Sequence, residues 1–223
     1  MNSSVKKFPI KIMSRKTPRT TPSRYANQRA DYSDDVIYPI LDEALFCTIS
    51  YAEDNVPFSI PQSFVRIDDH IYLHASVGSH LIRTIADGRP LCISVMLADD
   101  IVVAKTAFHH SVNYRSVVVY GKAEIIEDQE LKYDAFKALT EKMVPGSWDY
   151  LKPMSEKEMA KTTAVRIPLD EASAKTRQGQ PSHEEDEMDL PIWTGLIPIK
   201  PLRQTPVPDE HGAKIELPEH LKG

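Results

Sequence analysis

Hydrophobic and polar positions repeat with a helical period in two long segments of the chain. Apolar residues recur at this spacing between 36 and 45, after Ser33 or Asp34, either of which suits a helix cap. Pro39 lies inside the pattern, so the helix either begins near the proline or kinks there. A second amphipathic pattern covers 129–144. Two shorter helices are predicted within 77–90 and directly after the capping-box residues Ser155 and Glu158.

Between these helices the chain reads as β-strands joined by tight turns. β-Branched and aromatic residues alternate with polar ones, which is the period of a strand with one buried face. The predicted strands are 46–51, 56–67, 71–76, 91–98, 101–108, a long strand within 107–126, and 162–169. Parallel βαβ repetition is absent from this order. We therefore expect a mainly β fold, an antiparallel β-barrel with peripheral helices at its openings.

The chain divides into three parts by composition. Residues 1–30 hold eight basic residues and no acid, and they are rich in Pro, Thr and Ser. The prolines would break an amphipathic targeting helix, so we expect a basic, flexible arm that packs over the body towards its end. Residues 31–200 form one barrel domain, which includes an acidic connector at 178–189. Residues 201–223 form a Pro-rich tail.

Charge and composition argue against several classes of function. Beyond the arm, 19 basic residues stand against 32 acidic ones, a balance of −13 that disfavours nucleic-acid binding over the surface. The sequence has no run of eighteen apolar residues and no apolar secretory signal, so we expect no membrane association. Cys47 and Cys92 lie in apolar runs without pairing or metal spacing. Reduced thiols of a cytoplasmic protein are the expectation.

The long strand within 107–126 opens with polar residues where packing would favour valines. His109 and His110 are neighbours in this strand and so face opposite sides, which predicts no shared metal site. We expect each of them to cap a strand end or to bond a backbone carbonyl. Arg115 and Ser116 stand where the polar half gives way to the apolar half. The guanidinium suits a phosphate or carboxylate of a ligand; alternatively it forms a salt bridge with an acid of the body.

A second polar group lies where a strand meets the short helix. His74 and Ser76 end the strand, and residues 78–80, "GSH", open the helix. Free amides and the helix dipole favour an anion there, although small residues before a helix can also be a simple cap. Coupled with Arg115, the pattern suggests a phosphorylated ligand.

Pro61 implies either that its strand lies at the edge of a sheet or that the strand is irregular there, because a proline cannot donate a ladder hydrogen bond. Such an irregular strand leaves backbone groups free to bind the edge of a planar ring. Trp193 is the remaining large aromatic residue that could cover this ring, and core packing explains it equally well.

These segments resemble the FMN-binding split-barrel family related to pyridoxamine 5′-phosphate oxidase, in a branch similar to nitroimidazole-resistance reductases. The segments that carry the resemblance include "IPQSFVRIDDHIYLHASVGSHLIRTI", "AFHHSVNYRSVVVYGKAEII" and "PIWTGLIPI", and the whole match spans roughly 35–200. The resemblance implies a six-stranded antiparallel Greek-key split barrel that forms a homodimer with two FMN sites at its interface. The cofactor-binding residues that it implies are Pro61, Gln62, Ser63, His74, Ala75, Ser76, Ser79, His80, Arg115, Ser116 and Trp193.

The chain departs from the family pattern in two places. The family commonly has an arginine where His80 stands, so phosphate affinity should be weaker and more dependent on pH. The R-x-H arrangement of the vitamin-forming oxidases is also missing near the C-terminus, where "PIWTGLIP" stands instead. Pyridoxamine 5′-phosphate oxidase activity is therefore not expected.

The resemblance implies an FMN-dependent oxidoreductase that passes electrons from NAD(P)H or another donor to a small acceptor. No acid–base pair is assigned; His74 and Tyr114 are the only candidates for catalysis. The alternative on the same fold is a non-enzymatic cofactor-binding protein that stores or senses haem or flavin, and a deazaflavin also suits the wider fold group. A purely structural partner is the third hypothesis.

Overall fold

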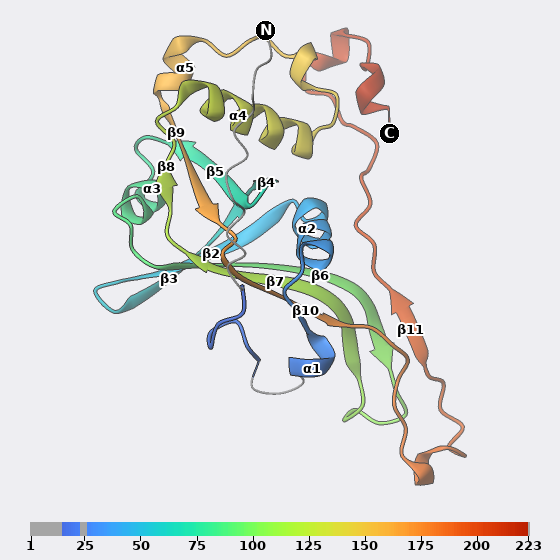
Figure 1. Ribbon diagram of the computed structural model, residues 1–223. Helices are drawn as coiled ribbons and strands as arrows, with labels where there is room; N and C mark the ends of the chain where they lie inside the picture. The colour runs from blue at the N-terminus through green and yellow to red at the C-terminus, as the bar shows by residue number, and fades with distance from the viewer. Residues whose placement is uncertain (1–14, 23–25, 223) are drawn as a thin grey trace, which may run out of the picture.

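The computed structural model describes residues 15–22 and 26–222. Short helices and antiparallel strands alternate along this part of the chain (Figure 1). The helices are α1 (Ala26–Arg29), α2 (Asp34–Glu43), α3 (His80–Ile85), α4 (Gln129–Met143) and α5 (Glu156–Ala160), with 3-10 turns at Trp148–Tyr150, Glu185–Glu187, Gly212–Lys214 and Glu219–Leu221. The strands are β1 (Ala30–Asp31), β2 (Phe46–Glu53), β3 (Val56–Ser63), β4 (Val65–Ile67), β5 (His70–Ser76), β6 (Leu91–Val103), β7 (Ser111–Gly121), β8 (Glu124–Ile125), β9 (Thr162–Pro168), β10 (Glu171–Arg177) and β11 (Gly195–Pro198).

The strands form two antiparallel sheets. A seven-stranded sheet has the order β1-β10-β7-β6-β2-β3, and β11 adds to the outer half of β6. A four-stranded sheet has the order β4-β5-β9-β8. The two sheets enclose the core, α4 and α5 lie above the smaller sheet, and the hairpin of β6 and β7 extends away from the body (Figure 1). The predicted mainly β split-barrel fold is confirmed.

The helices begin where side chains satisfy their free amides. Asp128 accepts hydrogen bonds from the backbone N–H groups of Glu130 and Leu131, which caps α4. Ser155 and Glu158 form the predicted capping box of α5. Helix α2 carries Pro39 inside it and places Ile37 and Leu41 in the core. The helix predictions are thus confirmed, and for α2 the helix begins ahead of the proline.

Several predicted strand boundaries were wrong. The single strand expected over 56–67 is divided at Phe64 into β3 of the larger sheet and β4 of the smaller one. The aspartates at 99 and 100 do not separate two strands, because β6 runs through them with an irregularity in its register between Ala98 and Asp100. Residues 104–110 form the hairpin turn, so His109 and His110 lie in a loop and not in the long strand. Strand β10 was missed altogether, because its apolar face consists of small alanines.

The end of the N-terminal arm packs on the body as expected. Arg15 donates from Nε to the carbonyl of Leu169 at 2.9 Å and forms ion pairs with Asp34 and Asp69. Arg19 pairs with Glu171 on β10. Residues 1–14, on which the flexible part of the prediction rests, lie outside the described residues. No helix in the described part is long and apolar enough to cross a membrane.

Candidate functional site

The junction of β3 and β5 brings together two groups of the predicted cofactor residues. The Gln62 side chain donates from Nε2 to the backbone carbonyl of His74 at 3.0 Å. This hydrogen bond links the end of β3, with Pro61 and Ser63, to the end of β5, with His74 and its neighbours. Pro61 keeps its place in the ladder opposite Thr48, so the strand is continuous there rather than broken. Strand β3 is the last strand of its sheet, so of the two alternatives for Pro61 the structure contains the sheet edge and not an irregularity at the proline.

The beginning of α3 lies directly after β5. The Oγ of Ser76 accepts a hydrogen bond from the N–H of Gly78 at 3.3 Å, and Ser79 occupies the cap position without a side-chain cap bond. His80 is largely exposed, with its Nε2 3.6 Å from a carboxylate oxygen of Glu53. The predicted cofactor residues from His74 to His80 therefore form one continuous segment from the end of β5 to the start of α3. The carboxylate of Glu53 lies beside His80 in this segment.

Arg115 is bound by two carboxylates of its own chain. Its Nε lies 3.0 and 3.1 Å from the two oxygens of Asp99 on β6, and its Nη2 lies 2.9 Å from an oxygen of Glu43 at the end of α2. The hydrogen bond to Glu43, followed by those to Asp99, raises the pKa of Arg115. In return, the hydrogen bond from Arg115 lowers the pKa of Glu43. The structure therefore contains the salt-bridge alternative. The role of Arg115 as a cofactor ligand stays a prediction.

Ser116 and Trp193, two other predicted cofactor residues, each contact neighbouring segments of the chain. Ser116 donates from Oγ to the carbonyl of Lys175 on β10 at 3.0 Å. Trp193 lies in the segment before β11 and is 66% exposed, so core packing does not explain it. Its ring approaches Gly195 so closely that a Cβ there would lie 2.9 Å from the ring. Tyr114 lies on β7 opposite Arg177, and no contact in the described part marks it as catalytic.

The histidines of the β6–β7 turn are held individually. His110 Nδ1 lies 2.9 Å from the carbonyl oxygen of Thr106, which is the expected bond to backbone. His109 Nε2 lies 3.4 Å from a carboxylate oxygen of Glu184 in the acidic connector. Lys105 fixes the end of this connector, because its Nζ donates to the carbonyls of Glu187 and Leu190.

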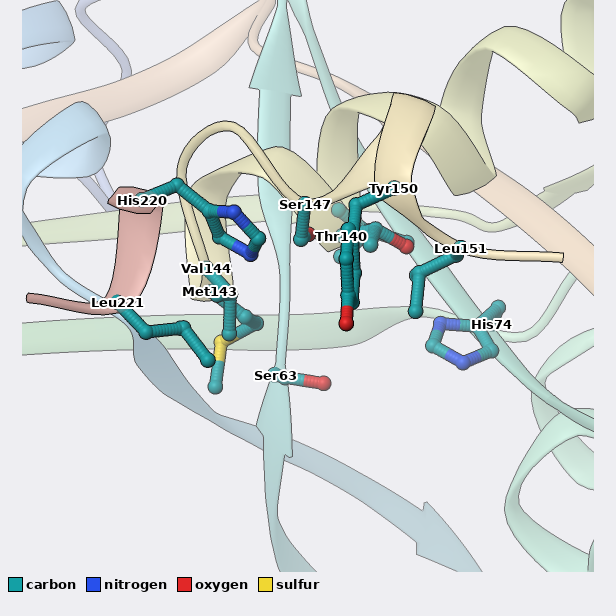
Figure 2. A pocket seen from close by; sticks show the side chains of 11 residues that line it. Ser63, His74, Thr140, Met143, Val144, Ser147, Tyr150, Leu151, His220 and Leu221 are labelled. Atoms are coloured by element: carbon teal, nitrogen blue, oxygen red, sulfur yellow. The ribbon is translucent and has the colours of Figure 1, made fainter. Parts of the chain in front are cut away.

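A cavity of about 440 Å³ lies beside the β3–β5 junction, between the smaller sheet, α4 and the end of the chain. We call it the histidine pocket. In Figure 2, His74 and His220 lie on opposite sides of it, with Tyr150 between them. Its lining residues are Ser63, His74, Leu139, Thr140, Met143, Val144, Ser147, Tyr150, Leu151, His220 and Leu221.

Two residues that line the pocket, His74 and Ser147, each have a side-chain polar atom without a hydrogen-bond partner among the described residues. These buried atoms are Nδ1 of His74 and Oγ of Ser147. The ring of His74 packs edge-on against Phe136, with 5.3 Å between the ring centroids. Burial lowers the pKa of His74, so the neutral imidazole is the favoured form. A neutral histidine in an apolar cavity can hydrogen-bond a ligand or coordinate a metal ion carried by one.

Sequence reasoning missed most of this pocket. His220 and Leu221 come from the Pro-rich tail, and Ser147 and Tyr150 come from the turn after α4. These segments are distant in sequence from His74, and no local pattern joins them. The usable signals were Ser63 and His74, which were both among the predicted cofactor residues and both line the pocket.

The chain matches the family model for pyridoxamine 5′-phosphate oxidase over residues 33–176. This match covers more than half of the chain, so the protein belongs to the pyridoxamine 5′-phosphate oxidase family. The fold, with its two antiparallel sheets and few helices, agrees with this membership.

Three solved structures are similar to it. The flavocytochrome Anf3 from Azotobacter vinelandii is 31% identical, with a TM-score of 0.84, and the match covers 92% of this chain and 95% of that one. A FAD- and haem-binding protein from Mycobacterium smegmatis is 28% identical, with a TM-score of 0.82 and coverage of 86% and 95%. A protein described as a candidate 5-nitroimidazole antibiotic resistance protein, from Bacteroides thetaiotaomicron VPI-5482, is 20% identical with a TM-score of 0.56, covers 66% and 85%, and supports the fold alone.

Proposed function

We propose that this protein is a redox protein that binds both a flavin and a haem and passes electrons from NAD(P)H or another donor to a small acceptor. The observation that carries the proposal is the histidine pocket, an apolar cavity lined by the half-buried His74, whose Nδ1 has no hydrogen-bond partner among the described residues. Two similar proteins, one described as a flavocytochrome and one as FAD- and haem-binding, support the pairing of cofactors. Their resemblance extends over most of both chains.

The histidine pocket fits a haem in three respects. Its volume and apolar lining are those of a cofactor site. His74 offers a neutral imidazole to an iron ion. A neighbouring cavity of about 590 Å³ shares Val144, His220 and Leu221 with the pocket, so the two cavities together offer room for a large planar group. When bound, the haem would supply one-electron chemistry.

The flavin site that we propose is the adjoining β3–β5–α3 edge. Pro61, Gln62 and Ser63 would contact the ring system, and residues 74–76 and 79–80 would follow the chain that leads to the phosphate. The Gln62–His74 hydrogen bond connects this edge to the histidine pocket. The two cofactors would thus share His74, with its backbone on the flavin side and its ring on the haem side.

We propose FAD as the flavin in place of the FMN implied by the sequence resemblance. The phosphate of FMN carries nearly two negative charges on one group and favours unpaired cations around it. The two cationic candidates of the predicted phosphate site already face carboxylates, His80 beside Glu53 and Arg115 between Glu43 and Asp99. The diphosphate of FAD carries one negative charge on each phosphate, so each phosphate requires fewer nearby cations than the phosphate of FMN does. The Mycobacterium smegmatis protein is also described as FAD-binding.

We further propose that the protein is a homodimer. Several large apolar side chains on the extension formed by β6, β7 and β11 are exposed, which is unusual for a monomer and typical of an interface. These side chains are Met96, Ile101, Phe108, Trp193 and Ile197. Light scattering should give twice the chain mass, and Ile101→Asp should reduce it to one chain mass with the fold retained.

The absorption spectrum of protein purified without added cofactor tests the function. We expect flavin bands together with a Soret band, and mass analysis of the released flavin should identify FAD. His74→Ala should abolish the Soret band, whereas His110→Ala, which removes an exposed histidine of the β6–β7 turn, should keep it. Anaerobic NADH or NADPH should bleach the flavin. A protein with flavin that no donor bleaches is a storage or sensing protein, and a spectrum without either cofactor refutes the proposal.

A further inference from the structure

The end of the chain crosses a long distance to reach the histidine pocket. After β11, residues 201–222 run back along the body to the end of α4 (Figure 1). We call this segment the C-terminal strap. Its last 3-10 turn, Glu219–Leu221, places His220 and Leu221 in the wall of the pocket. One wall of the pocket therefore belongs to a segment outside the two sheets.

The strap is attached at few points. Every residue from 201 to 211 is exposed, and among the described residues the hydrogen bond that joins the strap to the body is the one from Arg203 Nη2 to the carbonyl of Met143, at 2.9 Å. The other polar contacts described for the strap lie within it, such as the ion pair of Lys222 with Glu219. An exposed segment with so few bonds to the body opens at low free energy.

The strap also packs loosely along its length. Two cavities, of about 590 Å³ and about 410 Å³, lie along it, and their linings include Pro206 and Leu217. Close contact is confined to the end. The ring of His220 lies 5.2 Å from that of Tyr150, and Gly146, with φ of +78°, comes so near that an added Cβ would lie 3.0 Å from the Cβ of His220. Apart from the Arg203–Met143 hydrogen bond, the strap is therefore held to the body mainly by the packing of its tip.

We propose that the C-terminal strap is a releasable lid over the histidine pocket, with the Arg203–Met143 hydrogen bond as its hinge-side tether. Release removes His220 and Leu221 from the wall and leaves His74, Ser63 and Leu139 in place on the body. The pocket then opens to solvent on the side opposite His74. A small diatomic molecule could reach a haem iron through this opening. This last step rests on the proposed haem, whereas the lid itself does not.

The test compares full-length Arg203→Ala with Lys200→Ala, which removes a cation from an exposed position just ahead of the strap. Carbon monoxide is the probe for the ferrous haem-loaded protein. We expect Arg203→Ala to raise the observed association rate about fivefold, the factor that corresponds to one hydrogen bond of ordinary net strength, and Lys200→Ala to leave it unchanged. Leu221→Ala, which shortens the tip, should also raise the rate.

A second measurement needs no cofactor. Lys214 is exposed in the strap, and cleavage after it by a lysine-specific endoproteinase, which does not cut at position 203 in either protein, requires local release of the chain. Cleavage should accelerate by a similar factor in Arg203→Ala and not in Lys200→Ala. Faster cleavage in a protein that lacks a Soret band would reject the haem and retain the lid. Cleavage that is equally fast in wild type and Arg203→Ala would overturn the lid. Faster cleavage combined with unchanged carbon monoxide rates would retain the lid and reject its role in admitting a diatomic molecule to the haem.

Discussion

Replacement of Arg115 by methionine separates an architectural role from a role in cofactor binding. The side chains of Arg115 and Asp99 are each 25% exposed, so their contact is mostly removed from water, whereas Glu43 is 52% exposed. A hydrogen bond to a charged group contributes about 2 kcal/mol when it is largely buried, and an exposed ion pair contributes about 0.5 kcal/mol. Arg115→Met should therefore cost about 2–3 kcal/mol, which lowers the melting temperature by about 5–10 °C for a chain of this size.

Thermal unfolding followed by circular dichroism measures this cost, and fluorescence of the released flavin measures retention in the same samples. The hydrogen bond from Arg115 lowers the pKa of Glu43 in the folded protein. The stability that the Arg115–Glu43 ion pair contributes is therefore complete above the ordinary glutamate pKa of 4.5, and it is lost as the pH falls through the lower pKa of the folded state. Arg166→Met, which breaks an exposed pair with Glu124, should cost less than about 1 kcal/mol. An unchanged melting temperature combined with lost flavin would refute the structural assignment of Arg115.

Three other substitutions test the packing and the electrostatics of the body. Asp128→Ala should lower the free energy of unfolding by about 1 kcal/mol through loss of the α4 cap, with Asp128→Asn recovering most of it in urea titrations. Gly121→Ala should cost about 1–3 kcal/mol, because the new Cβ would lie 2.9 Å from Cγ2 of the buried Ile167; an unchanged urea midpoint would show that the core yields. Burial lowers the pKa of Lys142 to about 8 from 10.5, so the unfolded chain binds more protons between these values. The stability of the wild type relative to Lys142→Met should hence rise from pH 8 to pH 10, and a fall would contradict the shift.

Local signals in the sequence predicted most of the elements. The capping groups at Asp128 and at Ser155 act within a few residues, so their effect is visible in the sequence. Strand β10 escaped because Ala172 and Ala174, which are fully buried, have little intrinsic preference for strands. Its position depends on pairing with β7, more than fifty residues away. Local pattern cannot report such pairing.

The candidate site was predictable only where neighbours in the fold are also neighbours in sequence. Residues 74–80 form a continuous segment, and the structure keeps them together. Glu43 and Asp99, the partners of Arg115, come from a helix and from another strand, and the sequence could identify only that some acid might pair with it. The pocket wall at His220 required the path of the whole strap. The flavin edge was predicted because its residues are neighbours in sequence, and the histidine pocket was missed because its residues are neighbours only in the folded chain.

The register irregularity at Asp99 divides β6 into two lengths with different neighbours. Residues 91–94 pair with β2 on one side and β7 on the other. Residues 100–102 pair with β7, and residues 100–103 pair with the short β11. Asp99 fastens the boundary, because its carboxylate binds Arg115 and its carbonyl accepts the N–H of Ile199. The amide protons of the inner length should therefore exchange with solvent only on global unfolding, and those of the outer length whenever β11 detaches. A single strand thereby contains the border between two units of cooperative stability.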